Sequence, residues 1–276
     1  MDQLIELAII EDIGPADITS AALPQVPLKG EATIIAKEPV IIAGLGTARR
    51  VFERIDPKVC FCALSSDGDA ASVGQEIVQI VGDFRSLLMA ERIALNFLQR
   101  LCGIATHVRT FVGEIAGSSV RLVDTRKTIP GWRELEKYAV RMGGANNHRM
   151  GLYDGILIKD NHIAAFGDIR AAVSAARQTA SHLLKIEIEV TGLDQVREAL
   201  AAGADVIMLD NMNEADIRQA VSEINGRALV EVSGQVARGE LKSLADMGVD
   251  IISVGALIHA ARFVDLSMRI QLKESV

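Results

Sequence analysis

The sequence has little of what marks several classes of protein. Its three cysteines, Cys60, Cys62 and Cys102, are odd in number and lack CxxC spacing, so we expect neither disulfides nor a zinc site. Cys60 and Cys62 lie two apart in a predicted strand, and we expect both to be small buried residues on one side of it. This cysteine usage fits a reducing, cytoplasmic location.

Long apolar runs and an excess of positive charge are also absent. No stretch approaches the roughly 18 apolar residues of a membrane-spanning helix, and Asp2 and Glu6 without a basic segment argue against a signal peptide. The 29 Lys and Arg residues against 36 Asp and Glu give a net charge of −7, which argues against a nucleic-acid-binding protein. An anion site in such a chain must gather its cations locally.

The composition, 49% hydrophobic and 24% charged, is that of a globular protein, and 276 residues suit a barrel with a smaller domain. At the start, apolar residues at helical spacing are followed by Gly14 and a proline that end the helix. Strand-like runs follow at 30–36, 59–64 and 76–81. An amphipathic helix is predicted over 86–102, ending at Gly103. This part is predicted to be a small α+β module.

The pattern of apolar residues changes after residue 120, where short apolar runs alternate with stretches of helical periodicity. This alternation predicts βα units and a parallel sheet, and the runs lie at 120–124, 156–159, 186–190, 206–210, 229–232 and 251–254. Polar or small residues end these runs, as a (β/α) barrel requires at its active face. An open doubly wound sheet is the alternative, but no GxGxxG follows a strand. Gly203 and Gly248 are predicted to end two of the helices.

Cationic residues concentrate in two successive strand ends and the loop between them. Placed at one barrel mouth they would form an anion-binding pocket, and they are Arg126, Lys127, His148, Arg149 and Lys159. The alternative is that they are solvated surface cations, the usual fate of Lys and Arg. Because Arg126 and Lys127 directly follow an apolar strand, we favour the pocket.

Carboxylates and glycines occupy the next strand ends. Glu187 and Glu189 point to the same face of one strand, and Asp210 closes the next, so Glu189 and Asp210 could share a Mg²⁺ ion with a phosphorylated substrate. The alternative is that the two carboxylates only neutralise the neighbouring cations. Ser233-Gly234 and Gly255 form small-residue turns late in the barrel, a place where barrels often bind phosphate.

Several longer motifs resemble one enzyme family. They are Asp-Thr-Arg-Lys-Thr-Ile-Pro-Gly at 124–131, Asn-His-Arg-Met-Gly-Leu-Tyr-Asp at 147–154, Ile-Leu-Ile-Lys-Asp-Asn-His at 156–162, Glu-Ile-Glu-Val at 187–190 and Leu-Asp-Asn at 209–211. Together they closely resemble quinolinate phosphoribosyltransferase, also called carboxylating nicotinate-nucleotide pyrophosphorylase. The likeness extends over nearly the whole chain.

The resemblance implies an α/β protein of two domains. An N-terminal α/β sandwich domain would occupy residues 1–103, and an incomplete (β/α) barrel of about seven strands would occupy 104–262. The segment 263–276 would return to the N-terminal domain. The family implies a homodimer in which the N-terminal domain of one protomer covers the barrel mouth of the other; whether dimers assemble further is left open.

The resemblance also assigns roles to residues. Quinolinate would be bound through its two carboxylates by Arg92 of the neighbouring chain and by Arg126, His148, Arg149 and Lys159. The catalytic group would comprise Lys127, Lys159, Glu189 and Asp210, of which Lys127, Glu189 and Asp210 would face phosphoribosyl pyrophosphate, with Mg²⁺ held at Glu189 and Asp210, directly or through water. Ser233, Gly234 and Gly255 would bind its 5-phosphate.

The implied reaction is a pentosyl transfer in NAD biosynthesis: quinolinate and phosphoribosyl pyrophosphate would give nicotinate mononucleotide, pyrophosphate and CO₂. Two positions depart from the family pattern, Gln235 and Ala145, where glycine is common. Gln235 could narrow the phosphate loop or donate its amide to the phosphate. The alternatives are a related pyrophosphorylase associated with molybdenum transport, a catalytically silent barrel that binds an anionic metabolite, and a structural dimer scaffold.

Overall fold

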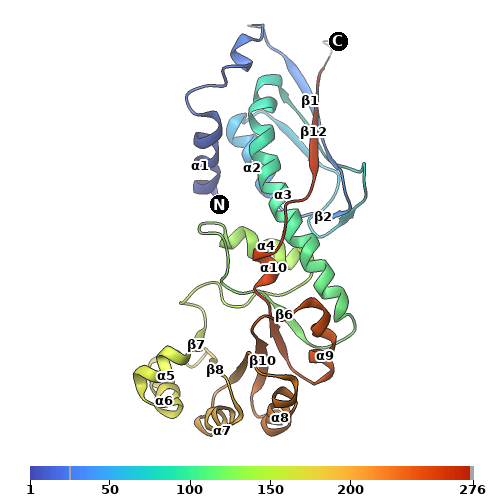
Figure 1. The fold of residues 1–276 in the computed structure, drawn as a ribbon. Helices are drawn as coiled ribbons and strands as arrows, with labels where there is room; N and C mark the ends of the chain where they lie inside the picture. The colour runs from blue at the N-terminus through green and yellow to red at the C-terminus, as the bar shows by residue number, and fades with distance from the viewer. Residues whose placement is uncertain (25, 274–276) are drawn as a thin grey trace. The chain divides into compact units, whose positions relative to one another are not determined.

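The computed structural model describes residues 1–24 and 26–273. Its contacts divide the chain into two compact units (Figure 1). The first contains residues 1–109, 128–144 and the C-terminal segment from residue 260, and the second contains residues 110–127 and 145–259. The domain boundary expected at residue 103 lies inside a helix and stays a prediction.

The first unit is built on a four-stranded antiparallel sheet in the order β12-β1-β5-β3. Its elements are α1 (Asp2–Ile13), η1 (Ser20–Ala22), β1 (Lys29–Ala36), β2 (Val40–Ile41), α2 (Leu45–Ile55), β3 (Cys60–Ala63), β4 (Ala70–Ala71), β5 (Glu76–Asp83), most of α3 (Phe84–Glu114), α4 (Arg133–Gly143) and β12 (Leu266–Leu272). The C-terminal strand β12 pairs with β1 along its full length, from Gly30 opposite Leu272 to Ala36 opposite Leu266. A strand from the N-terminal part of the chain and a strand from the C-terminal part therefore share one sheet.

The long helix α3 corrects one prediction. It was expected to end at Gly103, but it runs from Phe84 to Glu114 without a break. Gly103 serves a different purpose, because a Cβ atom there would lie 2.0 Å from the carbonyl oxygen of Arg262. The glycine thus permits a close approach of two backbones rather than ending the helix.

The predicted burial of two cysteines is also wrong. Cys60 and Cys62 do share one side of β3, but that side is exposed, while Cys102 on α3 is buried. The intervening Phe61 faces the protein instead, with its ring centroid 6.0 Å from that of Phe52 on α2. Burying the larger aromatic ring removes more apolar surface from water than burying two thiols would, which decides the orientation of the strand.

The second unit contains the predicted parallel sheet, with six strands in the order β6-β11-β10-β9-β8-β7. Its elements are β6 (Arg121–Val123), β7 (Ile156–Ile158), α5 (Asp160–Phe166), α6 (Ile169–Thr179), β8 (Ile186–Val190), α7 (Leu193–Ala202), β9 (Val206–Asp210), α8 (Glu214–Ile224), β10 (Leu229–Ser233), η2 (Arg238–Glu240), α9 (Leu241–Asp246), β11 (Ile251–Ser253) and α10 (Ala256–His259). Asn146 adds a single parallel bridge to Val123 beyond the edge strand β6. The α/β fold with an incomplete barrel is confirmed, with six strands and one bridge in place of about seven strands.

The barrel strands end where the sequence places polar or small residues. Neighbouring strands are in parallel register, with Val232 opposite Leu209 and Ser233 opposite Asp210. Their carboxyl ends therefore lie along one edge of the sheet. Gly203 and Gly248 adopt left-handed backbone conformations just after helices α7 and α9, as predicted.

The close approach at Gly103 predicts the effect of two substitutions in one helix. Gly103→Ala should lower the free energy of unfolding by about 3 kcal/mol, because its new methyl group would clash with a backbone oxygen that cannot rotate away. The matched control is Gly113→Ala in the same helix, where a Cβ atom meets nothing within 4 Å. The control should leave stability unchanged or raise it by up to about 1 kcal/mol. Urea denaturation of the two variants measures the difference, and equal midpoints would contradict the assignment.

Candidate functional site

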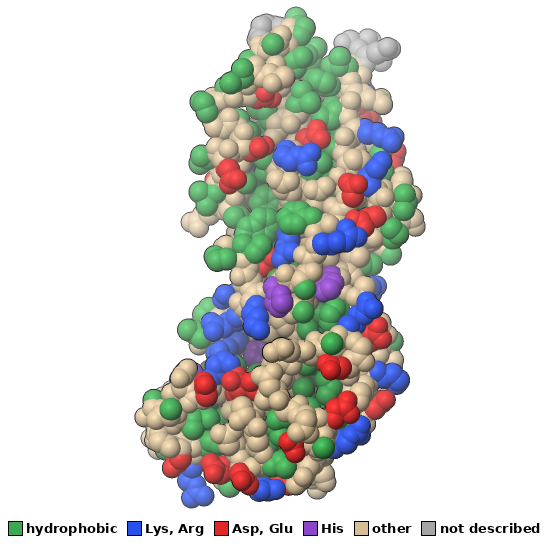
Figure 2. All heavy atoms as spheres, in the orientation of Figure 1, with side chains coloured by type: hydrophobic (Ala, Val, Ile, Leu, Met, Phe, Trp, Pro, Cys, Tyr) green, Lys and Arg blue, Asp and Glu red, His purple; other side chains and the backbone are tan. Residues whose placement is uncertain are grey.

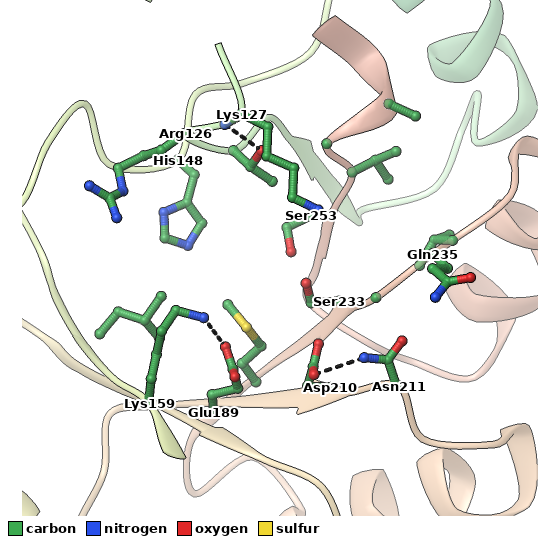
Figure 3. Close-up of a pocket in the computed structure, with 18 of the residues that line it drawn as sticks. Arg126, Lys127, His148, Lys159, Glu189, Asp210, Asn211, Ser233, Gln235 and Ser253 are labelled. Atoms are coloured by element: carbon green, nitrogen blue, oxygen red, sulfur yellow. Dashed lines mark hydrogen bonds and ion pairs between the residues drawn. The ribbon is translucent and has the colours of Figure 1, made fainter. Parts of the chain in front are cut away.

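A cavity of about 670 Å³ lies at the carboxyl ends of the parallel strands in the second unit (Figure 3). It is formed by the loops that follow the strands, so residues far apart in the sequence meet in it. The predicted site residues that line it are Arg126, Lys127, His148, Arg149, Lys159, Glu189, Asp210, Ser233, Gly234 and Gly255. The cations expected at one barrel mouth are thus brought together.

One predicted position lies elsewhere. Arg92 is an exposed residue of α3 and does not line this cavity. Its assignment to the site of a neighbouring protomer stays a prediction. Glu187, two residues before Glu189 on β8, lines a separate cavity of about 370 Å³.

One wall of the cavity carries two guanidinium groups, those of Arg126 and Arg149. Arg149 is half-buried, and its side chain donates a hydrogen bond of 3.0 Å to the carbonyl oxygen of Gly155. Burial lowers the pKa of Arg149, and the nearby positive charge of Arg126 lowers it further. Two cations held close together repel each other, so an anion between them would relieve the repulsion.

The segment that carries Arg149 is tied to the end of β6. Asp124 is completely buried and accepts two hydrogen bonds, one of 2.6 Å from Nδ2 of Asn147 and one of 2.9 Å from the backbone N–H of His148. Charge-assisted bonds of this length are strong. The aspartate that ends the first apolar run therefore has a positioning role in the loop.

The opposite wall carries the carboxylates. Glu189 on β8 forms a hydrogen-bonded ion pair with Lys159, which directly follows β7. Asp210 ends the adjacent strand β9 and accepts a hydrogen bond of 2.8 Å from Nδ2 of Asn211. Both carboxylates line the same cavity, and carboxylate oxygens are the donors that Mg²⁺ prefers. The donor set is therefore suitable for magnesium.

The two small-residue turns keep backbone close to neighbouring side chains. Gly234 has a φ of 96°, and a Cβ atom there would lie 2.3 Å from Oδ1 of Asn211. A Cβ atom at Gly255 would lie 2.8 Å from Cδ of Lys127. Gln235 follows with a φ of 40°, a left-handed conformation that side chains other than glycine rarely adopt. Glycine is needed at 234, where φ is positive and a Cβ atom would also lie 2.9 Å from the backbone nitrogen of Asn211, whereas at 255 a Cβ atom would displace the flexible side chain of Lys127.

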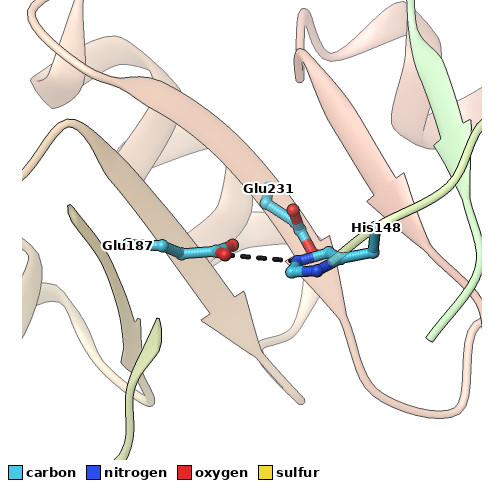
Figure 4. Close-up of side chains that lie close together, drawn as sticks. All are labelled: His148, Glu187 and Glu231. Carbon is cyan, nitrogen blue, oxygen red and sulfur yellow. Dashed lines mark ion pairs between the residues drawn. The ribbon is translucent and has the colours of Figure 1, made fainter. Parts of the chain in front are cut away.

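Sequence reasoning missed one member of a buried cluster, Glu231. It lies on β10 next to Glu187 and His148 (Figure 4). Burial raises the pKa of Glu231 to about 8, and the negative charge of Glu187 contributes to this increase. A charged residue inside the apolar run 229–232 was the available signal. Asn211 and Gln235 also line the main cavity.

No helix in the described part of the chain is long and apolar enough to cross a membrane.

The chain matches two family descriptions, "Quinolinate phosphoribosyl transferase, N-terminal domain" over residues 17–102 and "Quinolinate phosphoribosyl transferase, C-terminal domain" over residues 104–269. The two matches cover most of the sequence.

Curated relatives and solved structures agree with this match. A "Probable nicotinate-nucleotide pyrophosphorylase [carboxylating]" from Bacillus subtilis is 43% identical over 100% of this chain and 96% of its own length. One of the same name from Synechocystis is also 43% identical, over 98% of this chain and 92% of its own. The crystal structure of NadC from Streptococcus pyogenes superposes with a TM-score of 0.95 at 39% identity, covering 99% of this chain and 97% of that one. On these grounds the chain belongs to the quinolinate phosphoribosyltransferase family.

Proposed function

We propose that this protein transfers the phosphoribosyl group of phosphoribosyl pyrophosphate to quinolinate and releases CO₂, giving nicotinate mononucleotide and pyrophosphate for de novo NAD biosynthesis. The observation that carries the proposal is the composition of the main cavity, which combines four cations with two carboxylates: Arg126, Lys127, Arg149, Lys159, Glu189 and Asp210. The family and its curated relatives support the same reaction.

Electrostatics explains why such a cavity suits these substrates. Quinolinate carries two carboxylates and the donor carries several phosphate charges, so the two reactants repel each other in water. Arg126 and Arg149 supply planar donors that fit carboxylates, and Lys127 and Lys159 supply compact charges that can pair with phosphate. Holding both reactants in one poorly solvated pocket replaces their repulsion with fixed attraction and orients them for reaction.

The transfer step breaks one bond and forms another at the anomeric carbon. The bond to pyrophosphate breaks with its electron pair leaving on the phosphate oxygen, and the pyridine nitrogen supplies the pair for the new bond. We assign Lys127 to the leaving pyrophosphate, because it lines the same cavity as Glu189 and Asp210, the carboxylates proposed to hold the magnesium ion of the donor. The C2 carboxylate then departs as CO₂, its electron pair remaining on C2 beside the cationic nitrogen until a proton is added.

Magnesium would be held by Glu189 and Asp210, directly or through water. When bound it would neutralise charge on the departing pyrophosphate. Lys159 neutralises Glu189 in the structure described here, and we propose that it turns to a substrate carboxylate when the metal occupies the site. The turns at Ser233, Gly234 and Gly255 would place backbone close to the 5-phosphate.

We further propose a homodimer in the cytoplasm, with Arg92 completing the site of the partner. The apolar surface of the first unit supports association, since Leu7 and Ile10 of α1 are 63% and 66% exposed and Ile18 is 84% exposed. Figure 2 shows apolar side chains on the surface of this part of the chain. Apolar side chains exposed in this way are common at interaction sites.

The reaction is tested by incubating the purified protein with Mg²⁺, phosphoribosyl pyrophosphate and either quinolinate or nicotinate. Quinolinate should give equal amounts of nucleotide and CO₂, nicotinate should give little, and EDTA should abolish turnover because the donor is used with its metal. Nucleotide is followed by chromatography and CO₂ by release from carboxyl-labelled quinolinate. Turnover of neither pyridine would favour the molybdenum-associated homologue or a silent anion-binding barrel.

Lys127→Ala should lower kcat by about a hundredfold while changing the KM for quinolinate by less than about threefold, because the lysine is assigned to charge that develops on pyrophosphate. Steady-state kinetics with each substrate varied in turn measures the split. The control is Lys242→Ala, which removes an exposed lysine paired with Asp246 on α9. Unchanged kcat in Lys127→Ala would refute the assignment.

The shared site predicts that two inactive variants restore each other. Arg92→Ala and Lys127→Ala should each retain only about one per cent of wild-type activity alone, but mixed dimers contain one site with both residues intact. Random pairing makes half of the dimers mixed, so the unfractionated mixture should recover about a quarter of wild-type activity and isolated mixed dimers about half. Coexpression with two different affinity tags supplies the mixed dimers for assay. No recovery in isolated mixed dimers would place both residues in one protomer's site.

A further inference from the structure

Two buried glutamates that are outside the set assigned to the reaction lie inside the barrel beside His148, one of the residues predicted to bind quinolinate. Glu231 on β10 is 1% exposed and Glu187 on β8 is 8% exposed. Nε2 of His148 lies 3.2 Å from Oε2 of Glu187 and 3.5 Å from Oε1 of Glu231. Barrel interiors are ordinarily filled by branched aliphatic side chains, so two carboxyl groups there call for a physical reason.

The hydrogen bonds of His148 fix the position of its proton. The backbone N–H of Arg149 donates to Nδ1 of His148 over 2.8 Å. A nitrogen that accepts a hydrogen bond carries a lone pair, so the proton of the neutral ring must be on Nε2, which faces the carboxyl groups. A metal ion at Nε2 would need the lone pair there instead. The geometry therefore favours a proton-bearing cluster over a metal site.

Two adjacent buried carboxyl groups cannot both carry a negative charge at low cost. Oε1 of Glu187 and Oε1 of Glu231 are each buried without a hydrogen-bond partner among the described residues. Glu187 is the acceptor closer to Nε2–H, and Glu231, the more buried of the two, is the better holder of a proton. The cluster then contains a neutral histidine, one carboxylate and one carboxylic acid.

We propose that Glu187 and protonated Glu231 are positioning residues that hold His148 as its Nε2–H form, so that Nδ1 receives the Arg149 N–H and the carboxylate-binding wall of the cavity keeps its shape. The inference rests on the proposed function, since that wall is where quinolinate would bind. Arg149 faces another cation, Arg126, and would turn away from it if its backbone were free. The ring of His148 lines both the main cavity and the smaller one, so it connects the cluster to the site.

The proposal gives a direction for the effect of pH. Above about pH 8 Glu231 loses its proton, and the two buried carboxylates then repel each other. As Glu187 and Glu231 move apart, Nε2–H of His148 is held less firmly, so the wall loosens and the KM for quinolinate rises. Three further charged residues line the smaller cavity and contribute to the electrostatic potential around the cluster, in addition to Arg149. They are Arg121, Asp154 and Lys185.

Paired substitutions separate positioning from simple stability. Glu231→Gln keeps the shape of the side chain and gives it an amide that cannot lose its hydrogen-bond donor. The variant should therefore have the wild-type KM for quinolinate at pH 7, and this KM should no longer rise above pH 8. Glu231→Ala should raise that KM by about tenfold while changing the KM for phosphoribosyl pyrophosphate by less than about twofold. The control, Ile224→Val, trims a fully buried side chain of the same unit on α8 and should leave both KM values unchanged. Equal KM effects on both substrates in Glu231→Ala would overturn the proposal.

A second measurement does not depend on turnover. Nitrogen chemical shifts of the histidine rings, assigned by comparison with His148→Gln, should give the Nε2–H form of His148 at pH 7 in the wild type and in Glu231→Gln. An Nδ1–H form, or binding of one Zn²⁺ or Mn²⁺ per chain that Glu231→Gln abolishes, would overturn the proposal. If the wild type fails to use quinolinate, the proposed function fails, while the ring form still decides whether the cluster holds His148 as described.

Discussion

Mutual repulsion of like charges is the constraint on which this structure depends. A chain with a net charge of −7 holds four cations in one cavity, where they would separate if nothing restrained them. The restraints are visible as buried acceptors and ion pairs. Asp124 fixes the segment before Arg149, and Glu189 neutralises Lys159. The acidic residues of the chain are thus part of the reason that its cations can be concentrated.

Parallel strands supply the rest of the restraint. Because βα units place every strand end at one edge of the sheet, the residues at and after the strand ends contribute to the same cavity. Asp210 and Ser233, 23 positions apart along the chain, are opposite each other in the register of β9 and β10. The rigid sheet provides position, and the connections that follow its strands provide chemistry.

The sequence predicted those features that local pattern controls. Alternating apolar runs located the six barrel strands within one or two residues, and their polar ends identified the cavity. It failed where distant packing decides: the backbone of Arg262 explains Gly103, and the ring of Phe61 explains the exposure of Cys60 and Cys62. No local pattern records the approach of Gly103 to Arg262, and the alternation within a short strand does not say which of its two sides meets helix α2.

Glu231 is the clearest case of information that only the fold reveals. In the sequence it is one acidic residue in an apolar run, and its neighbours along the chain give no reason for a charge. In the fold it meets Glu187 and His148, and burial beside another carboxylate raises its pKa to about 8. Replacing either carboxyl group by an aliphatic residue would remove its desolvation cost, so retaining both costs stability. That cost is understandable if the cluster orients the ring of His148. The guanidinium groups of Arg126 and Arg149 repel each other, so this wall of the cavity keeps its shape only if its backbone is held in place. The hydrogen bond from the Arg149 N–H to His148 provides that restraint.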